Sequence, residues 1–255
     1  MKRYGLRLDS VSILAALAIG AAALAGCATQ GSTTRATSSS HPSGVVYARP
    51  AAASPADVPS SGGSKAAAAD VNPEPVIACF GDSLTAGLGI DRDQSYPAVL
   101  QRMLDEAGYH YRVLNEGVSG DTTKDGLERL NRVLAQKPQI VVLEFGGNDG
   151  LRGLPVRTAQ QNLATMIEQL QHEHAKVALA GISLPPQYGG QYITQFDAMY
   201  PTLARQFHVP LLPFILQDVY GVQGDIQPDG VHPTAQGAKQ VAANVEKLIR
   251  PLLKK

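Results

Sequence analysis

Four short segments of the chain combine a reactive or hydrogen-bonding side chain with the small residues of turns. Residues 81–84 (Gly-Asp-Ser-Leu) carry the hydroxyl of Ser83, and residues 228–233 (Pro-Asp-Gly-Val-His-Pro) carry Asp229 and His232. A serine becomes a nucleophile when an imidazole within hydrogen-bond reach takes its proton, and a carboxylate then holds the imidazole in the correct tautomer. Asp229 and His232 are three residues apart on a turn, so they can pair locally. These residue types predict acyl transfer by a serine nucleophile.

The other two segments could supply hydrogen-bond donors to a negatively charged oxygen. Residues 117–123 (Gly-Val-Ser-Gly-Asp-Thr-Thr) contain glycines, which let the backbone approach a ligand closely. Asn148 lies between glycines in residues 146–150 (Gly-Gly-Asn-Asp-Gly), and a fixed carboxamide can donate an N–H to an oxyanion. Judged one at a time, each of the four segments is more typical of a turn or a helix cap. Only their combination favours catalysis.

Apolar runs alternate with segments of helical spacing from residue 76 onward. The runs cover residues 76–80, 111–114, 140–145, 177–182 and 210–214. Between them apolar side chains recur every three or four residues, as at Leu163, Met166, Ile167 and Leu170. Nearly continuous apolar runs are typical of parallel strands that are covered on both faces. The pattern predicts one α/β domain over residues 76–255, a three-layer sandwich with a five-stranded parallel sheet.

The four segments fall where such a sheet would place a site. Open parallel sheets bind ligands at the carboxyl ends of their strands. Three segments follow apolar runs, after Phe80, Leu114 and Phe145, and the fourth comes late in the chain. We therefore expect chemistry at these loops.

The same segments, taken in order, resemble the four blocks of the SGNH/GDSL hydrolase family. The resemblance rests on residues 81–84, Gly120, Asn148 and the pair Asp229 and His232. Further stretches look like the periplasmic thioesterase, arylesterase and lysophospholipase subgroup, namely residues 146–153, 184–189, 200–201 and 209–214. The resemblance covers residues 76–252. Thr85 stands where the Gly-x-Ser-x-Gly turn of α/β-hydrolases has glycine, which disfavours that fold.

This resemblance implies a fold, a mechanism and a set of site residues. The fold is flavodoxin-like, Ser83 attacks an ester or thioester carbonyl, His232 accepts the proton and Asp229 orients the imidazole. The oxyanion hole consists of the backbone N–H groups of Ser83 and Gly120 and the side-chain amide of Asn148. The activity is that of an arylesterase, lysophospholipase or acyl thioesterase, without cofactor or metal, in a monomer. Asp82 and Asp149 are expected to shape their loops.

Two other functions remain open at this stage. A carbohydrate O-acetylesterase would use the same four blocks, although the low aromatic content, 5% with no Trp, gives little support for sugar stacking. A lipoprotein without catalytic activity, which binds lipid or a partner, would fit if the site had decayed. Because every residue of the four blocks is present, an enzyme is the favoured interpretation.

The N-terminus is typical of an export signal followed by a tether. Residues 1–26 begin with basic residues and continue with an apolar stretch shorter than a membrane-spanning helix. Residues 24–27 (Leu-Ala-Gly-Cys) resemble the lipobox of bacterial lipoproteins, which implies cleavage before Cys27 and a lipid on its sulfur. Residues 27–75 are rich in Ser, Ala, Thr, Gly and Pro and predict a disordered tether. The Ala at position 28 favours an outer-membrane lipoprotein facing the periplasm in a Gram-negative host.

Composition argues against other classes of partner. The charges of the 22 basic and 22 acidic residues cancel, so no net charge attracts nucleic acid. We expect contact with the membrane only through the lipid on Cys27. His172 and His174 lie two apart on an expected helix and do not share a face, so they make a poor metal pair. Cys79 lies in an apolar run, where a free thiol is expected to be a buried structural residue.

Overall fold

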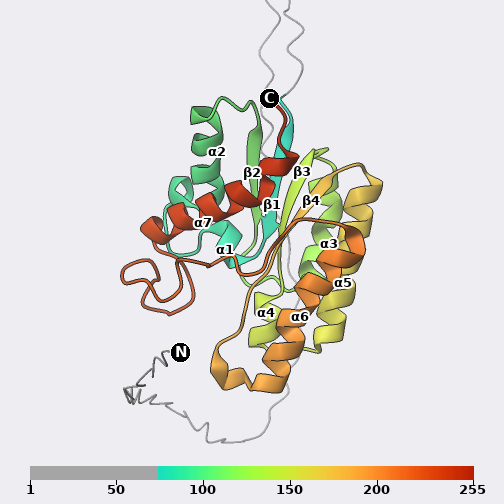
Figure 1. Cartoon of the computed structure of the whole chain (residues 1–255), viewed down its shortest axis with the longest axis vertical. Helices are drawn as coiled ribbons and strands as arrows, with labels where there is room; N and C mark the ends of the chain where they lie inside the picture. The colour runs from blue at the N-terminus through green and yellow to red at the C-terminus, as the bar shows by residue number, and fades with distance from the viewer. Residues whose placement is uncertain (1–73) are drawn as a thin grey trace, which may run out of the picture. The chain divides into compact units, whose positions relative to one another are not determined.

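The computed structural model describes residues 74–255 (Figure 1). The predicted export signal, Cys27 and all but the last two residues of the predicted tether lie outside this part of the chain. Within it, no helix is long and apolar enough to cross a membrane.

Five parallel strands form a single sheet. They are β1 (Val76–Gly81), β2 (Arg112–Gly117), β3 (Ile140–Glu144), β4 (Lys176–Ala180) and β5 (Leu211–Leu212), in the spatial order β2-β1-β3-β4-β5. All residues of β1 and β3 are buried, as their continuous apolar runs predict. Because the order reverses direction between β1 and β3, the loops after these strands border a crevice, where open sheets bind ligands.

Helices cover both faces of this sheet. They are α1 (Ser83–Ala86), α2 (Tyr96–Glu106), α3 (Thr123–Leu134), α4 (Gly147–Leu151), α5 (Val156–His172), α6 (Gly190–Phe207) and α7 (Ala235–Ile249), with short 3-10 turns at Arg92–Gln94, Pro186–Tyr188 and Arg250–Leu252. Figure 1 shows α2 and α7 on one side of the sheet and α3, α5 and α6 on the other. The predicted three-layer α/β fold with a five-stranded parallel sheet is confirmed.

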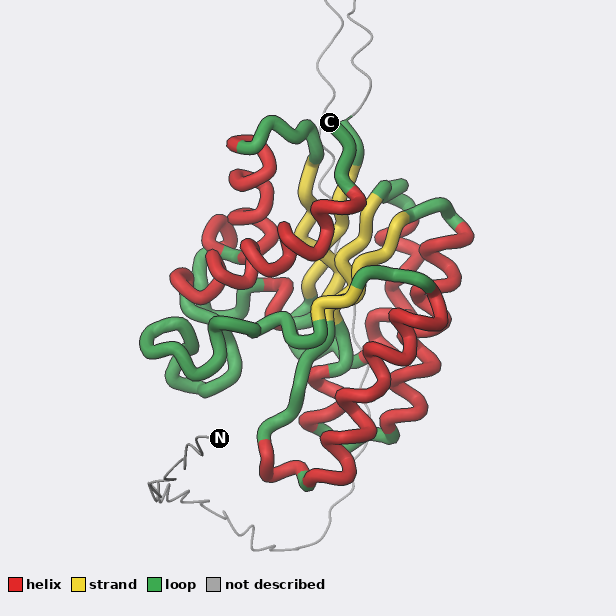
Figure 2. Tube along the Cα trace, in the orientation of Figure 1, coloured by secondary structure: helices red, strands yellow, loops and turns green. Residues whose placement is uncertain are grey.

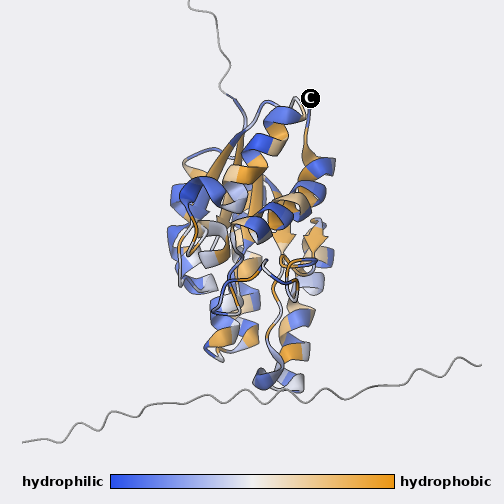
Figure 3. Ribbon diagram, turned by 90° about the vertical axis from the view of Figure 1, so that its left-hand side faces the viewer, coloured by the Kyte–Doolittle hydropathy of each residue, from blue (hydrophilic) through white to orange (hydrophobic). Residues whose placement is uncertain are grey.

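The hydrophobic core follows the spacing of the sequence. Leu163, Met166, Ile167 and Leu170 form the inner face of α5 and are fully buried. Cys79 on β1 is a free, buried cysteine, as expected. Figure 3 shows the apolar colouring concentrated on the strands and the polar colouring on the outer faces of the helices.

The last strand is shorter than predicted. The sequence predicts a strand over residues 210–214, but β5 spans only Leu211 and Leu212. Pro210 and Pro213 flank it, and proline has no backbone N–H to donate to a ladder. Figure 2 shows that the chain between β5 and α7 runs as loops and turns. The segment that carries His232 therefore reaches the sheet edge without regular structure of its own.

Candidate active site

Ser83, His232 and Asp229 form a continuous line of hydrogen bonds. Ser83 is the first residue of α1, directly after β1. Its Oγ lies 2.8 Å from Nε2 of His232, and Nδ1 of His232 lies 2.7 Å from Oδ2 of Asp229. The serine and the histidine are 149 residues apart in the sequence, so only the fold brings them together. This arrangement lets the imidazole take a proton from the hydroxyl while the carboxylate holds its other nitrogen.

Asp229 is also bound by the backbone of its own turn. Its Oδ1 accepts the N–H groups of Val231, at 2.9 Å, and of His232, at 3.0 Å. Partial burial opposes ionisation of this carboxyl group, but these two N–H groups and the His232 side chain outweigh it and lower the pKa of Asp229 to about 2. Asp229 is therefore a fixed carboxylate that can stabilise a charged imidazolium.

Gln227 links the turn that carries His232 to the segment that follows α1. The sequence analysis did not single it out. Its backbone N–H donates to the carbonyl oxygen of His232 at 2.8 Å. Its side-chain Nε2 donates to the carbonyl oxygens of Leu88 and of Pro233, each at 2.8 Å. Leu88 comes directly after the turn that ends α1. No local pattern distinguishes this glutamine from a surface residue, because both contacts of its amide are set by the fold.

The nucleophile turn is capped by a buried aspartate. Asp82 precedes α1, and its Oδ1 accepts the N–H of Leu84 at 3.1 Å, as a helix N-cap does. Burial raises the pKa of Asp82 to about 6, although the Leu84 N–H and the nearby His232 act in the opposite direction. The role predicted for Asp82, shaping its loop, agrees with these contacts.

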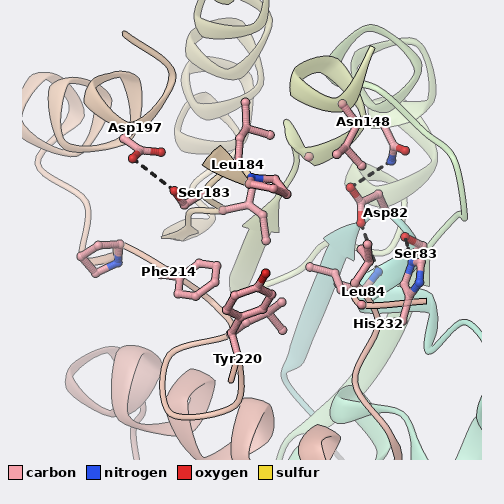
Figure 4. A pocket seen from close by; sticks show the side chains of 18 of the residues that line it. Asp82, Ser83, Leu84, Asn148, Ser183, Leu184, Asp197, Phe214, Tyr220 and His232 are labelled. Carbon is pink, nitrogen blue, oxygen red and sulfur yellow. Dashed lines mark hydrogen bonds between the residues drawn. The ribbon is translucent and has the colours of Figure 1, made fainter. Parts of the chain in front are cut away.

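The side chain of Asn148 lines the same cavity as Ser83, but its amide already donates two hydrogen bonds within the protein. Nδ2 of Asn148 donates to Oδ2 of Asp82 at 3.1 Å (Figure 4). It also donates to the carbonyl oxygen of Asp121 at 2.9 Å. Both N–H groups thus have acceptors in the protein. The Asn148 amide can bind an oxyanion only if one of its N–H groups is shared between two acceptors or turns away from Asp82. Asn148, Ser83 and Gly120 all line the same cavity.

Gly120 has a backbone conformation that favours glycine. Its φ is +88°, in the left-handed region, and its carbonyl oxygen accepts a hydrogen bond from Nη2 of Arg152 at 2.8 Å. This contact fixes the orientation of the peptide after Gly120 at the cavity wall. The glycine that the sequence singled out is therefore required by local geometry.

Arg129 of α3 joins the ends of β1 and β2 to the loop that follows β2, and sequence reasoning missed it. Its guanidinium donates to Oδ2 of Asp121 at 2.6 Å, to the carbonyl oxygen of Glu116 at 2.9 Å and to that of Gly81 at 2.8 Å. It also lies 4.6 Å from the centre of the Phe80 ring. Because Asp121 in turn accepts from Asn148, this one cation holds the ends of β1 and β2 and the loop that orients the amide.

Asp149 fixes the loop after β3 to the start of α3. Its two carboxylate oxygens accept the backbone N–H of Thr123, at 2.8 Å, and the Thr123 hydroxyl, at 2.7 Å. Burial raises the pKa of Asp149, and the two hydrogen bonds from Thr123 oppose that rise. The contacts agree with the loop-shaping role predicted for this residue.

A largely apolar pocket opens from the Ser83–His232 pair. Its volume is about 810 Å³. Figure 4 shows Leu184, Phe214 and Tyr220 between the Ser83 end of the pocket and a polar pair at its far end. In this pair the Ser183 hydroxyl donates to Asp197 at 3.2 Å. No Lys or Arg side chain is among the residues that line this pocket in the described chain.

Three further histidines of the described chain lie at the ends of α5 and α6. His172, the last residue of α5, has an exposed side chain that contacts Glu173. His174 and His208 both have positive φ and follow the ends of α5 and α6. Across residues 74–255, no group of three or more His, Cys, Asp or Glu side chains is arranged to hold a metal ion.

Comparisons with known proteins identify the family of the chain. Residues 79–240 match the GDSL-like lipase/acylhydrolase family. The chain is 48% identical to Esterase TesA of Pseudomonas aeruginosa over 174 residues, which cover 68% of this chain and 87% of that protein. It is 38% identical over 190 residues to Thioesterase 1/protease 1/lysophospholipase L1 of Escherichia coli, covering 74% and 88%. The crystal structure of TesA superposes with a TM-score of 0.68 at 47% identity, over 70% of this chain and 99% of that one.

Proposed function

The chain belongs to the GDSL-like lipase/acylhydrolase family and is an SGNH serine esterase, and we propose that Ser83, His232 and Asp229 are its catalytic triad. We propose further that its substrates are esters or thioesters of apolar acyl chains, including aryl esters and lysophospholipids. The observation that carries the proposal is the line of hydrogen bonds from Ser83 through His232 to Asp229 at one end of an apolar pocket.

The reaction proceeds through an acyl-enzyme. Oγ of Ser83 attacks the carbonyl carbon while Nε2 of His232 takes the hydroxyl proton, and Asp229 stabilises the imidazolium. The tetrahedral intermediate collapses, and His232 gives its proton to the leaving alcohol or thiol. Water then attacks the acyl-enzyme, with His232 again accepting a proton, and the acid is released with Ser83 restored.

The negative charge of the intermediate is held by three donors. They are the backbone N–H groups of Ser83 and Gly120 and the side-chain amide of Asn148. Each such donor is worth about 3 kcal/mol of the barrier. Asn148 contributes by sharing the N–H that it directs at Asp82 in the free enzyme, so a carboxylate and an oxyanion compete for the same donor.

The pocket supports acyl chains over acetyl groups. A volume of about 810 Å³ is within the range of sites that enclose a whole small ligand, and an acetyl group would leave most of it empty. The lining side chains Leu184, Phe214 and Tyr220 offer apolar surface to a hydrocarbon chain. These features favour an acylesterase over a carbohydrate O-acetylesterase.

One substrate series tests the proposal. We would measure kcat/KM for p-nitrophenyl esters of increasing acyl length, for a lysophospholipid, for an acyl thioester and for an acetylated sugar. The proposal predicts that kcat/KM rises with acyl length and that the acetylated sugar is the poorest substrate. Ser83→Ala should lower kcat on the order of 10⁵- to 10⁶-fold and should not react with a fluorophosphonate probe. Wild-type turnover by Ser83→Ala would exclude the assigned nucleophile.

We also propose that the protein is exported and anchored by a lipid on Cys27. The support is the sequence of residues 1–27 alone, with its basic start, apolar stretch and Leu-Ala-Gly-Cys end. The test is metabolic labelling with an alkyne fatty acid in cells expressing the full chain or Cys27→Ser. Label and membrane fractionation should both be lost in the variant. A Cys27→Ser protein that remains in the membrane fraction with its label would contradict the anchor.

A further inference from the structure

A second carboxyl group lies beneath the nucleophile turn, and the mechanism above does not use it. Glu144 is the last residue of β3 and is 1% exposed. Its Oε2 accepts the backbone N–H of Asp82 at 3.3 Å and the hydroxyl of Thr85 at 2.9 Å. These two partners stand on either side of Ser83 in the sequence. One carboxyl oxygen therefore holds both ends of the turn that carries the nucleophile.

The register of the sheet creates this contact. Gly81 on β1 is paired with Glu144 on β3, so the acidic side chain starts level with the residue that opens the nucleophile turn. A side chain at position 81 would overlap both Oε2 of Glu144 and the Thr85 hydroxyl. Glycine is needed here for space, and the space is filled by the carboxyl group of Glu144.

Glu144 is buried, and no Lys, Arg or His side chain within residues 74–255 forms an ion pair with it. The titratable groups around it are Asp82 from the nucleophile turn, Tyr96 from α2 and Tyr200 from α6. Burial, with the neighbouring Asp82 as a second cause, raises the pKa of Glu144 well above its usual range. Its Oε1 is fully buried with no hydrogen-bond partner in the described chain. A neutral carboxylic acid avoids the cost of an isolated buried charge.

A neutral Glu144 also connects to Asn148. Its Oε2 accepts the backbone N–H of Asp82, which fixes the start of the nucleophile turn. Asp82 then uses Oδ1 for the N–H of Leu84 and Oδ2 for the amide of Asn148. The position of Asn148 thus depends on Asp82, and the position of Asp82 depends on Glu144.

We propose that Glu144 is a positioning residue for the esterase reaction, which fixes the Ser83 turn from both sides and, through Asp82, fixes the Asn148 amide. This inference rests on the proposed function, because it assigns Glu144 to the support of the same nucleophile and oxyanion donor. Glu144 touches no substrate. Its effect is therefore expected in the rate of the chemical step rather than in substrate binding.

The test compares two substitutions of nearly the same size. Glu144→Gln keeps an acceptor for the Asp82 N–H and the Thr85 hydroxyl. Glu144→Met removes all of these contacts. We expect Glu144→Gln to keep kcat within about fivefold of wild type, and Glu144→Met to lower kcat about 10- to 100-fold with KM changed less than about twofold, since small displacements of catalytic groups cost rates of this order.

Two further variants serve as a control and as an alternative test. Glu246→Gln alters another buried carboxyl group, on α7, which pairs with Arg250 far from the site. It should leave kcat unchanged. Should Glu144→Met fail to fold, Thr85→Val removes one of the two Oε2 contacts and should lower kcat several-fold. All rates are measured on full-length protein well below its melting temperature, together with the labelling rate of Ser83 by a fluorophosphonate.

The outcomes separate this inference from the proposed function. A folded Glu144→Met enzyme with wild-type kcat would overturn the positioning role while leaving the triad intact. An equal loss in Glu144→Gln and Glu144→Met would also overturn it, because the amide should preserve the contacts. Activity that persists in Ser83→Ala would instead overturn the proposed function itself.

Discussion

The two halves of the proposed catalytic site are built in different ways. The nucleophile half uses buried polar side chains on the loops after β1, β2 and β3, and Asp82 is only 3% exposed. The base half is a surface turn between β5 and α7, where the Asp229 side chain is 45% exposed. The first half is held by contacts between elements, whereas the second is held mostly by hydrogen bonds within its own turn.

The two halves have different chemical tasks. Charge develops on the oxygen near Ser83, and preorganised donors in a buried site stabilise such charge best. The imidazole, in contrast, needs only the correct tautomer and one contact to the serine, which a local turn can provide. We therefore expect changes in the base half to affect rate with little effect on stability, and changes in the nucleophile half to affect both.

Apart from replacement of Ser83 itself, the largest effect should come from Asp229→Asn in the base half. The new amide would donate to Nδ1 of His232, which moves the imidazole proton to Nε2 and prevents that atom from accepting the proton of Ser83. We expect kcat to fall by up to about 10⁴-fold, with the melting temperature nearly unchanged because the residue is exposed. Steady-state kinetics and circular dichroism check this. Asp218→Asn, on the same surface segment, is the control, and a fall of less than tenfold in Asp229→Asn would argue against the triad.

Asn148→Ala should have the next largest effect, in the nucleophile half. Removing one oxyanion donor should lower kcat about 10²- to 10³-fold. It also leaves Oδ2 of Asp82 without its Asn148 partner, so the free energy of unfolding should fall by about 1 kcal/mol as well. Kinetics and urea denaturation measure both effects, with Asn131→Ala on the exposed face of α3 as the control. Wild-type kcat in Asn148→Ala would remove this residue from the oxyanion hole.

Asp149→Ala tests the structural side of the comparison. It would leave the N–H and the hydroxyl of Thr123 without acceptors in a buried site, so the free energy of unfolding should fall by about 2 kcal/mol. The same substitution at Asp229 should cost less than about 1 kcal/mol because water can reach the groups it exposes. Urea denaturation of both variants decides the point. Equal losses would show that the two halves are held equally firmly.

The smallest effect concerns pH and Asp229. Its pKa falls from 3.8 in the unfolded chain to about 2 in the fold, so its contribution to stability is present above about pH 4 and is lost as pH falls toward 2. Exposure screens this contribution, and we expect less than about 1 kcal/mol. The difference in unfolding free energy between wild type and Asp229→Asn should therefore shrink between pH 5 and pH 2.5. A difference that grows on acidification would contradict the lowered pKa.

Much of the site could be predicted from the sequence because its local patterns are strong. Ser83 follows an apolar run, and Asp229 and His232 are close enough in the chain to pair without help. Arg129, Gln227 and Glu144 could not be found in this way, because each acts through contacts with residues distant in the sequence. Only Glu144 left a signal, as an acidic residue within the apolar run of residues 140–145.

The sequence by itself determined the fold class, the five strands, the helix faces and the identity of the family, since hydrophobic periodicity and short motifs are properties of neighbouring residues. The tertiary structure alone decided which groups meet. The pairing of Gly81 with Glu144 places a buried carboxyl group under Ser83, and the amide of Asn148 is held by Asp82 before any substrate arrives. Strand register and long-range hydrogen bonds set these contacts, and neither is encoded in a local stretch of chain.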